Sequence, residues 1–471
     1  MSALISRTGL EVVGLLKSGE ISPLDCLDAL EKRITAVNAP VNALVTLCFD
    51  RARRNAGELM KCPVHERGEL AGLPVPIKDL TDVAGVRSTQ GSRIFKDRIA
   101  ETSDVLVRHL EGEGGIIYAM SNTPEFGAGA QTFNDVFGIT RNPWDTRLTP
   151  AGSSGGAAVA LATGMAWLAH GSDMGGSLRN PASFCGVVGM RPSPGRVASS
   201  VVSKIDGTLG VEGPMARNVL DCALMLDAMS GQMPGDLLSQ PKPRQSFFKD
   251  AGSGWKPKRV AVSRDLGITP VDPEIADIVL SAARKLQGVG VIVEETHPDM
   301  AEAMQSFQIL RALSFATGMR QLLIDHRDNL KPEVIWNIEK GLKLSGDDIA
   351  RAEAQRGMLF RRMHEFFKSY DVLLCPATIV PPFPVEERFV KSCDGVQFET
   401  YVDWLLIVAV ATLCACPAIS IPCGFTRSRL PVGLQIIAPN HNDGALLASA
   451  KFIEDVLDAG MTTPMDPIIR H

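Results

Sequence analysis

Apolar positions fall at helical spacing in several segments of the chain, and each such segment is followed by a short apolar run. Over residues 103–113 they share one helical face, Gly114 and Gly115 then break the pattern, and the run 116–119 has the length of a strand. Alternation of this kind predicts the α/β class, a sheet covered by helices. The same order recurs as a strand over 259–263, a helix over 273–286 and a strand over 289–295.

The rest of the pattern predicts further elements without marking a clean domain boundary. Ser22 followed by Pro23 and Asp25 is typical of a helix start, so we expect a helix from there to about Val37. We expect a helical region over 1–66 packed on a core domain over 67–471, with one large domain overall. Within the core we expect an extended segment over 71–80, a Pro- and Gly-rich surface linker over 231–258 and a mostly helical stretch over 301–370. Strands over 417–422 and 432–438 and a helix over 442–457 are expected near the end of the chain.

One stretch is long and apolar enough to raise the question of a membrane span. Residues from Trp404 to Thr426 include no charged side chain. Pro417, Pro422 and Gly424 interrupt the stretch, however, and a spanning helix is rarely broken in this way. We therefore expect a buried helix followed by a short buried strand.

Composition narrows the function classes. The 471 residues are 45% hydrophobic and 21% charged, which excludes wholesale disorder. The formal net charge of −5 is spread without long blocks of one sign, so we expect neither nucleic acid nor a membrane as partner. The ten cysteines include no C-x-x-C pair and lie mostly in apolar runs. Together with the lack of a secretory signal in the first residues, this predicts a protein of the reducing cytoplasm.

Two clusters of glycine and serine carry the candidate chemistry, one over 151–156 and one over 171–179. In the second cluster, Gly175 and Gly176 would leave successive backbone N–H groups unobstructed beside Ser177. An oxyanion hole needs such N–H groups, because they stabilise the negative charge of a tetrahedral intermediate. Ser177 is therefore a candidate nucleophile.

A serine nucleophile needs a base to take its proton. None of the eight histidines carries an accompanying motif, and we interpret His170, inside an apolar stretch, as structural. A lysine can serve as the base when burial lowers its pKa. Lys78 follows the apolar, proline-stiffened run 73–77 and meets that demand, although a lysine in such a place more often lies at the surface.

Three motifs at their spacing resemble the amidase signature family: Gly72–Lys78 (Gly-Leu-Pro-Val-Pro-Ile-Lys), Gly152–Gly156 and Gly175–Ala182. The resemblance extends over nearly the whole chain, with a generic middle over 231–396, and continues through Cys185–Gly189, Arg191–Arg196, Pro417–Pro422 and Pro431–Gln435. It implies a large mixed sheet sandwiched between layers of helices, and a homodimer.

The resemblance also implies the site residues. By motif, Ser177 is the nucleophile, Ser153 is a bridging serine that follows a cis peptide bond, and Lys78 is the base. Ala151 and Arg191 depart from the family pattern, which usually has glycine and lysine there, without touching this triad. The oxyanion hole is expected from the backbone N–H groups of Met174, Gly175, Gly176 and Ser177, and support from Ser154, Asp173 and Arg179.

The implied activity is that of an amidohydrolase acting on carbon–nitrogen bonds other than peptide bonds. We expect a small-molecule linear amide to be hydrolysed through a Ser177 acyl-enzyme, releasing a carboxylate and ammonia or an amine. No metal or other cofactor is expected, because patterns such as H-E-x-x-H are absent from the sequence. The sequence does not identify the natural amide.

Three other interpretations stay open. Gly152–Gly156 also satisfies the G-x-S-x-G nucleophile elbow of esterases with Ser154 as nucleophile, but the polar segment 142–150 before it does not predict the strand that an elbow needs. Another family role is the amidase subunit of a glutamine-dependent aminoacyl-tRNA amidotransferase, which would share the triad. A non-catalytic binding protein is hard to reconcile with an intact triad. Two S-x-x-K matches, at 246–249 and 253–256, lack their companion motifs and are attributed to chance.

Overall fold

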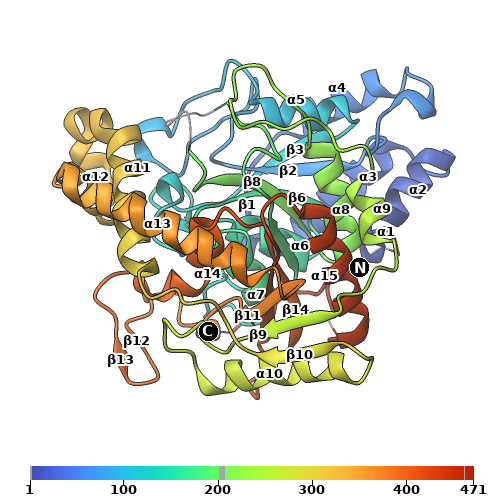
Figure 1. Ribbon diagram of the computed structural model, residues 1–471. Helices are drawn as coiled ribbons and strands as arrows, with labels where there is room; N and C mark the ends of the chain where they lie inside the picture. Colours follow the sequence, from blue (N-terminus) through green and yellow to red (C-terminus); the bar gives the residue numbers. More distant parts are fainter. Residues whose placement is uncertain (1–2, 201–206, 461, 471) are drawn as a thin grey trace.

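An eight-stranded mixed sheet lies at the centre of this computed structural model, which describes residues 3–200, 207–460 and 462–470 (Figure 1). The first three strands pair in parallel and the others antiparallel, and helices pack on the sheet, as predicted. In sheet order the strands are β10 (Ile292–Glu295), β9 (Arg259–Val262), β11 (Val372–Pro376), β15 (Pro431–Ile437), β14 (Ala418–Phe425), β7 (Val188–Arg191), β8 (Val211–Ala216) and β6 (Leu168–Asp173).

A second, three-stranded sheet has the order β1-β3-β2. Its strands are β1 (Leu44–Leu47), β3 (Ile116–Ser121) and β2 (Pro74–Lys78). β2 is the edge strand of this sheet and packs beside β6, the edge strand of the large sheet. The two sheets therefore meet along β2 and β6, and this meeting line positions the site.

The N-terminal part of the chain is mostly helical, and it also supplies β1. Its helices are α1 (Ala3–Ser6), α2 (Gly9–Ser18), α3 (Pro23–Val41) and α4 (Phe49–Leu59), followed by η1 (Val64–Glu66). The hydroxyl of Ser22 accepts from the N–H of Asp25, and the Asp25 carboxylate accepts from the N–H of Ser22 in return. This capping box starts α3 where expected. The helix continues past Val37 to Val41, where Asn42 adopts a left-handed conformation and ends it.

The helices that pack around the large sheet bury most of the core. They are α6 (Gly155–Ala162), α7 (Arg179–Cys185), α8 (Val219–Met229), α10 (Pro273–Gln287), α14 (Leu406–Leu413) and α15 (Asp443–Leu457). The predicted helix α5 (Val105–Gly112) and strands β3 and β9 lie where the pattern places them. The strand predicted from Val289 begins only at Ile292, because backbone bonds from Val289 and Val291 to Leu286 form a turn first.

The uncharged stretch 404–426 folds as predicted, into η5 (Asp403–Leu405), α14 and then β14. In the part of the chain that the structure describes, no helix is both long and apolar enough to span a bilayer.

The segment 231–258 is more than the surface linker that its composition predicts. It includes the short helix α9 (Phe247–Ala251), whose first N–H groups donate to the carboxylate of Asp227 on α8. Phe247 and Ala251 are buried against the core, and Asp236 and Leu238 line a cavity at the end of β6. A composition rich in proline and glycine shows where regular structure ends but not what the chain then contacts.

The middle of the chain forms three helices that lie together at one side of the molecule (Figure 1). These are α11 (Ala303–His326), α12 (Pro332–Leu342) and α13 (Gly346–Phe366), as the helical spacing over 301–370 predicts. The remaining short elements are η2 (Arg93–Phe95), η3 (Glu125–Gly127), β4 (Phe133–Asn134), β5 (Gly138–Ile139), η4 (Arg327–Asn329), β12 (Ser392–Cys393) and β13 (Val396–Gln397).

Candidate active site

Lys78 is the last residue of β2, a strand whose five residues are all buried. Its ammonium donates to three hydroxyl groups, with distances from Nζ of 2.7 Å to Ser153 Oγ, 2.9 Å to Ser154 Oγ and 3.0 Å to Ser172 Oγ. A lysine ammonium has three N–H donors, and here each has a neutral acceptor. Among the described residues no carboxylate forms an ion pair with Lys78.

Burial sets the protonation of this lysine. Removal from water lowers the pKa of Lys78 to about 7, and the negative charges of Glu212 and Asp173 only partly oppose that effect. A large share of the amine is therefore neutral near pH 7, and a neutral amine can accept a proton from one hydroxyl while donating to the other two. This is the state that a general base requires.

The first serine cluster is held by close backbone packing. The Gly152–Ser153 peptide bond is cis, and Ser154 then stands at the start of α6. At Gly156, on the first turn of α6, a Cβ atom would stand 2.3 Å from the backbone nitrogen of Asn122 and 2.6 Å from the carbonyl oxygen of Ala43. Only glycine lets α6 approach that loop so closely, and the contact fixes where the serines lie.

The second cluster is organised by a buried ion pair at the end of β6. The carboxylate of Asp173 accepts from Nε and Nη2 of Arg179, at 3.0 and 2.8 Å, and both side chains are fully buried. It also accepts from the backbone N–H groups of Gly176 and Leu178, each at 3.1 Å. These bonds hold the turn that presents Ser177. Although burial favours the neutral acid, the Arg179 and Arg191 guanidinium groups keep the pKa of Asp173 well below its usual range.

The two clusters are joined through their backbones, since the N–H of Ser154 donates to the carbonyl of Ser177 at 3.1 Å. Ser153 and Ser177 both line the cavity at the end of β6. Their hydroxyls form no hydrogen bond with each other within the described part of the chain. The structure thus brings the predicted base and bridging serine into contact and places the predicted nucleophile in the same cavity.

The four backbone N–H groups predicted for the oxyanion hole differ in what they contact. The N–H of Gly176 donates to the Asp173 carboxylate, so that group already has a partner. Among the described residues, the N–H groups of Met174, Gly175 and Ser177 have no protein acceptor. These three remain free to donate to an oxygen atom in the cavity.

Three further residues surround Lys78 that the sequence did not single out for this role: His170, Ser172 and Glu212. The backbone N–H of Lys78 donates to Nδ1 of His170 at 3.2 Å, and Nε2 of that ring lies 2.7 Å from the Glu212 carboxylate. His170 and Ser172 are two residues apart on β6, and Ser172 is directly opposite Glu212 on β8. Alternation along a strand could have placed His170 and Ser172 on one face, but the β6–β8 register is invisible in the sequence.

Ser154 does not sit as an esterase nucleophile would. Its side chain is fully buried, it is absent from the cavity wall, and its Oγ accepts from Lys78. The segment before it forms a turn in place of a buried strand. Both observations oppose the nucleophile-elbow interpretation.

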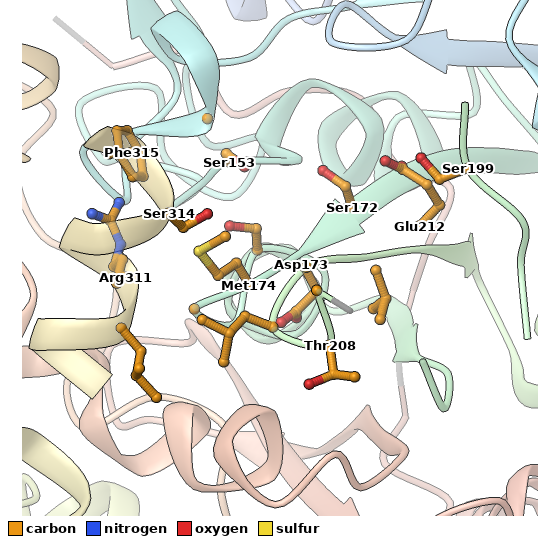
Figure 2. Close-up of a pocket in the computed structure, with 18 of the residues that line it drawn as sticks. Ser153, Ser172, Asp173, Met174, Ser199, Thr208, Glu212, Arg311, Ser314 and Phe315 are labelled. Carbon is orange, nitrogen blue, oxygen red and sulfur yellow. The ribbon is translucent and has the colours of Figure 1, made fainter. Parts of the chain in front are cut away.

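The cavity beside these serines has a volume of about 320 Å³. The two ends of the cavity differ, as Figure 2 shows. Ser153, Met174 and Asp173 lie between them. Arg311 and Phe315 of α11 lie at one end, and Glu212 and Ser199 lie at the other. The wall near α11 is largely apolar, with Phe126, Leu310, Phe315 and Leu405. Among the described residues, no group of three or more His, Cys, Asp or Glu side chains is arranged to hold a metal ion.

Comparison with known proteins places this arrangement in a family. The model of the Amidase family matches residues 25–447. The chain belongs to the amidase signature family. This amidase is 34% identical over 466 residues to an acylamidase from Rhodococcus erythropolis, with 98% of this chain and 97% of that protein covered. It is 32% identical over 461 residues to a glutamyl-tRNA(Gln) amidotransferase subunit from Alkaliphilus metalliredigens, covering 92% and 93% of the two chains.

The fold agrees with that assignment. A crystal structure of a bacterial aryl acylamidase of the amidase signature enzymes superposes with a TM-score of 0.90 at 26% identity, covering 98% of this chain and 97% of that one. This amidase is therefore a hydrolase of carbon–nitrogen bonds other than peptide bonds, on a mixed α/β fold.

Proposed function

We propose that this amidase acts by itself on small carboxylic amides, with Ser177 as nucleophile, Ser153 as bridging hydroxyl and Lys78 as base. The observation that carries the proposal is a buried lysine with a pKa of about 7, 2.7 Å from a serine in the cavity that also holds Ser177. The support that comes from relatives is the 34% identity to an acylamidase over almost the full length of both chains.

The proposed reaction has two halves. Neutral Lys78 takes the Ser153 proton while Ser153 takes that of Ser177, and Ser177 Oγ forms a bond to the amide carbonyl carbon. The N–H groups of Met174, Gly175 and Ser177 donate to the oxyanion. The proton then returns along the same path to the nitrogen, the carbon–nitrogen bond breaks, and ammonia or an amine leaves. Water attacks the acyl-enzyme by the same relay and releases the carboxylate.

Labelling with a fluorophosphonate probe tests the triad directly. We expect a single adduct on Ser177 in the wild-type protein, found by peptide mapping, and no adduct in Ser177→Ala. Lys78→Ala should slow labelling and amide hydrolysis by at least about 100-fold, the range typical of a lost general base. An adduct on Ser154, or hydrolysis that survives in Ser177→Ala, would contradict the proposal.

A matched control separates the loss of a base from the loss of a buried lysine. Lys331 is also buried, with its pKa lowered to about 8 by burial, and its Nζ donates to the carbonyl of Ala128 at 2.7 Å. It does not line the cavity. We expect Lys331→Ala to lower stability but to keep the Ser177 adduct.

The second candidate function is that of an amidotransferase subunit, which the 32% identity to one such subunit supports. Ammonia release from glutamine distinguishes the two. We expect the purified chain to hydrolyse simple amides without a partner. Activity only on glutamine, and only with a copurified partner, would favour the amidotransferase role.

A further inference from the structure

Arg311 is a buried cation in the wall of the cavity, on helix α11. Its side chain is 5% exposed, and Figure 2 shows it beside Phe315 at the end opposite Glu212. Its guanidinium carbon lies 4.4 Å from the ring centre of Phe315 and 5.3 Å from that of Tyr401, two residues that also line the cavity. The cation therefore borders the space where a substrate would bind.

The acceptors around Arg311 are neutral. Its Nη1 donates to the amide oxygen of Asn337, and the Tyr401 hydroxyl is a further hydrogen-bond partner. Asn337 in turn donates to that hydroxyl at 2.6 Å and to the carbonyl of Glu333 at 2.6 Å, so the group is held from two helices and a loop. Within the described residues no carboxylate lies in ion-pair contact with Arg311.

Two carboxylates on the neighbouring elements, Glu333 and Asp403, are engaged elsewhere. Glu333 pairs with Arg388, with Nη2 and Oε1 2.6 Å apart. Asp403 accepts from the N–H groups of Glu399 and Thr400 and from the side chain of Gln308. A second cation stands nearby, since the pKa of Lys340 is lowered by burial and by the charge of Arg311, with Asp403 opposing. Arg311 and Lys340 therefore place two cations near this end of the cavity.

A buried charge is ordinarily paired, because removal from water is costly unless an opposite charge compensates for it. Here the guanidinium is oriented by neutral groups and is left with no anion of the described protein. We infer that the substrate carries an anionic group, a carboxylate or its chemical equivalent, which pairs with Arg311 while the scissile amide lies at Ser177. This inference rests on the proposed amide hydrolysis and narrows its substrate class.

The test compares pairs of amides in which one member has a carboxylate and the other has a neutral group at the same position. One pair places the anion in the acyl part, succinic acid mono-para-nitroanilide against butyric acid para-nitroanilide. The other places it in the amine part, N-butyryl-para-aminobenzoate against its neutral para-carboxamide. We expect the wild-type kcat/KM to be higher by about 10- to 100-fold for the anionic member of at least one pair, the range of a hydrogen bond to a charged group. The pair that shows the preference identifies which part of the substrate contacts Arg311.

Variants assign that preference to one residue. Arg311→Gln should bring the ratio of kcat/KM for the anionic member to kcat/KM for the neutral member of a pair close to 1, whereas Arg311→Lys should keep part of the preference. The matched variant is Arg356→Gln, because Arg356 also lines the cavity but donates to Leu413 and Thr208. Arg356→Gln should keep the preference for the anionic substrates. Equal losses for anionic and neutral substrates in Arg311→Gln, or a preference lost only in Arg356→Gln, would overturn the inference.

A binding measurement separates this inference from the proposed function. Calorimetric titration of Ser177→Ala with both pairs reads the anion site without turnover. Selective binding of the anionic members without hydrolysis by the wild type would support the anion site and contradict the proposed function. Hydrolysis with no preference for the anionic members, either in rate or in binding, would support the proposed function and contradict the anion site.

Discussion

At the scale of single residues, the site depends on a lysine whose polar partners are all uncharged. An ion pair would stabilise the ammonium and raise its pKa, whereas hydroxyl groups can accept from the ammonium or donate to the neutral amine. Ser153, Ser154 and Ser172 provide such groups. Glu212 affects Lys78 only through its charge, because its carboxylate contacts His170.

We therefore predict a pH dependence that Glu212 controls. The amine of Lys78 must be neutral, so kcat/KM for a neutral amide should rise with pH through about 7. The negative charge of Glu212 favours the ammonium, and Glu212→Gln should move this rise to lower pH. Glu212→Asp keeps the negative charge, so kcat/KM should rise at a pH closer to that of the wild type. A pH–rate profile measures both, and a rise that moves upward in Glu212→Gln would contradict the prediction.

The Asp173–Arg179 pair gives a prediction on stability. Arg179→Met leaves a fully buried carboxylate without its main partner, which should lower the free energy of unfolding by about 3–5 kcal/mol. The comparison is Lys368→Met, which breaks the exposed pair with Glu365 and should leave the free energy of unfolding nearly unchanged. Urea denaturation measures the two variants, and similar small losses in both would show that the buried pair is not needed for stability.

At the scale of elements, the cavity wall depends on how closely α11 and α12 approach each other. Gly341 on α12 faces α11, and a Cβ there would stand 2.1 Å from the carbonyl oxygen of Ala312. Arg311 and Asn337, which hold the cation end of the cavity, lie on these same two helices. A change in the spacing of these helices would thus change the shape of the cavity without changing any residue that lines it.

Gly341→Ala tests this spacing. The added methyl group must push the helices apart, so we predict a loss of about 1–3 kcal/mol in the free energy of unfolding. Gly57 on α4 offers the matched variant, because nothing lies within 4 Å of its Cβ position. Gly57→Ala should stabilise the protein by about 0.5–1 kcal/mol through helix propensity. Thermal and urea unfolding distinguish the two, and a stabilised Gly341→Ala protein would contradict the prediction.

At the scale of the whole molecule, local pattern predicted elements better than it predicted what they contact. The helix starts at Ser22 and Pro273 and the strand before Lys78 follow from capping and periodicity, which act within a few residues. Ser177 was predicted from the glycines beside it as well as from the family motifs, whereas the role of Ser153 came from the family motifs alone. His170 and Glu212 were missed because their meeting requires the β6–β8 register, and Arg311 because helical spacing over α11 does not show which face borders a cavity.

The ten cysteines lead to a prediction about the molecule as a whole. All of them lie in the described residues and are unpaired, and only Cys62 is exposed. Burial raises the pKa of Cys26 and Cys375 to about 12, which keeps those thiols unreactive. A thiol reagent should modify Cys62 rapidly in the native protein, without loss of activity, the half-buried Cys48 more slowly, and the eight buried cysteines only on unfolding. Rapid native modification of several cysteines would contradict this burial.

Because two sheet edges meet at the site, the proposed base of this enzyme is completed only when the two sheets assemble. Lys78 belongs to the small sheet, while Ser172 and His170 belong to the edge of the large one, and side chains connect the two. Until β2 docks against β6, the lysine is hydrated and keeps the basicity of any surface lysine, because its low pKa comes from burial. If Lys78 is the base, a partly folded chain with both sheets formed but undocked would contain all the proposed catalytic residues and still be inactive. Enzymatic activity should therefore report whether the two sheets are docked, and mild denaturant should abolish the activity before either sheet unfolds.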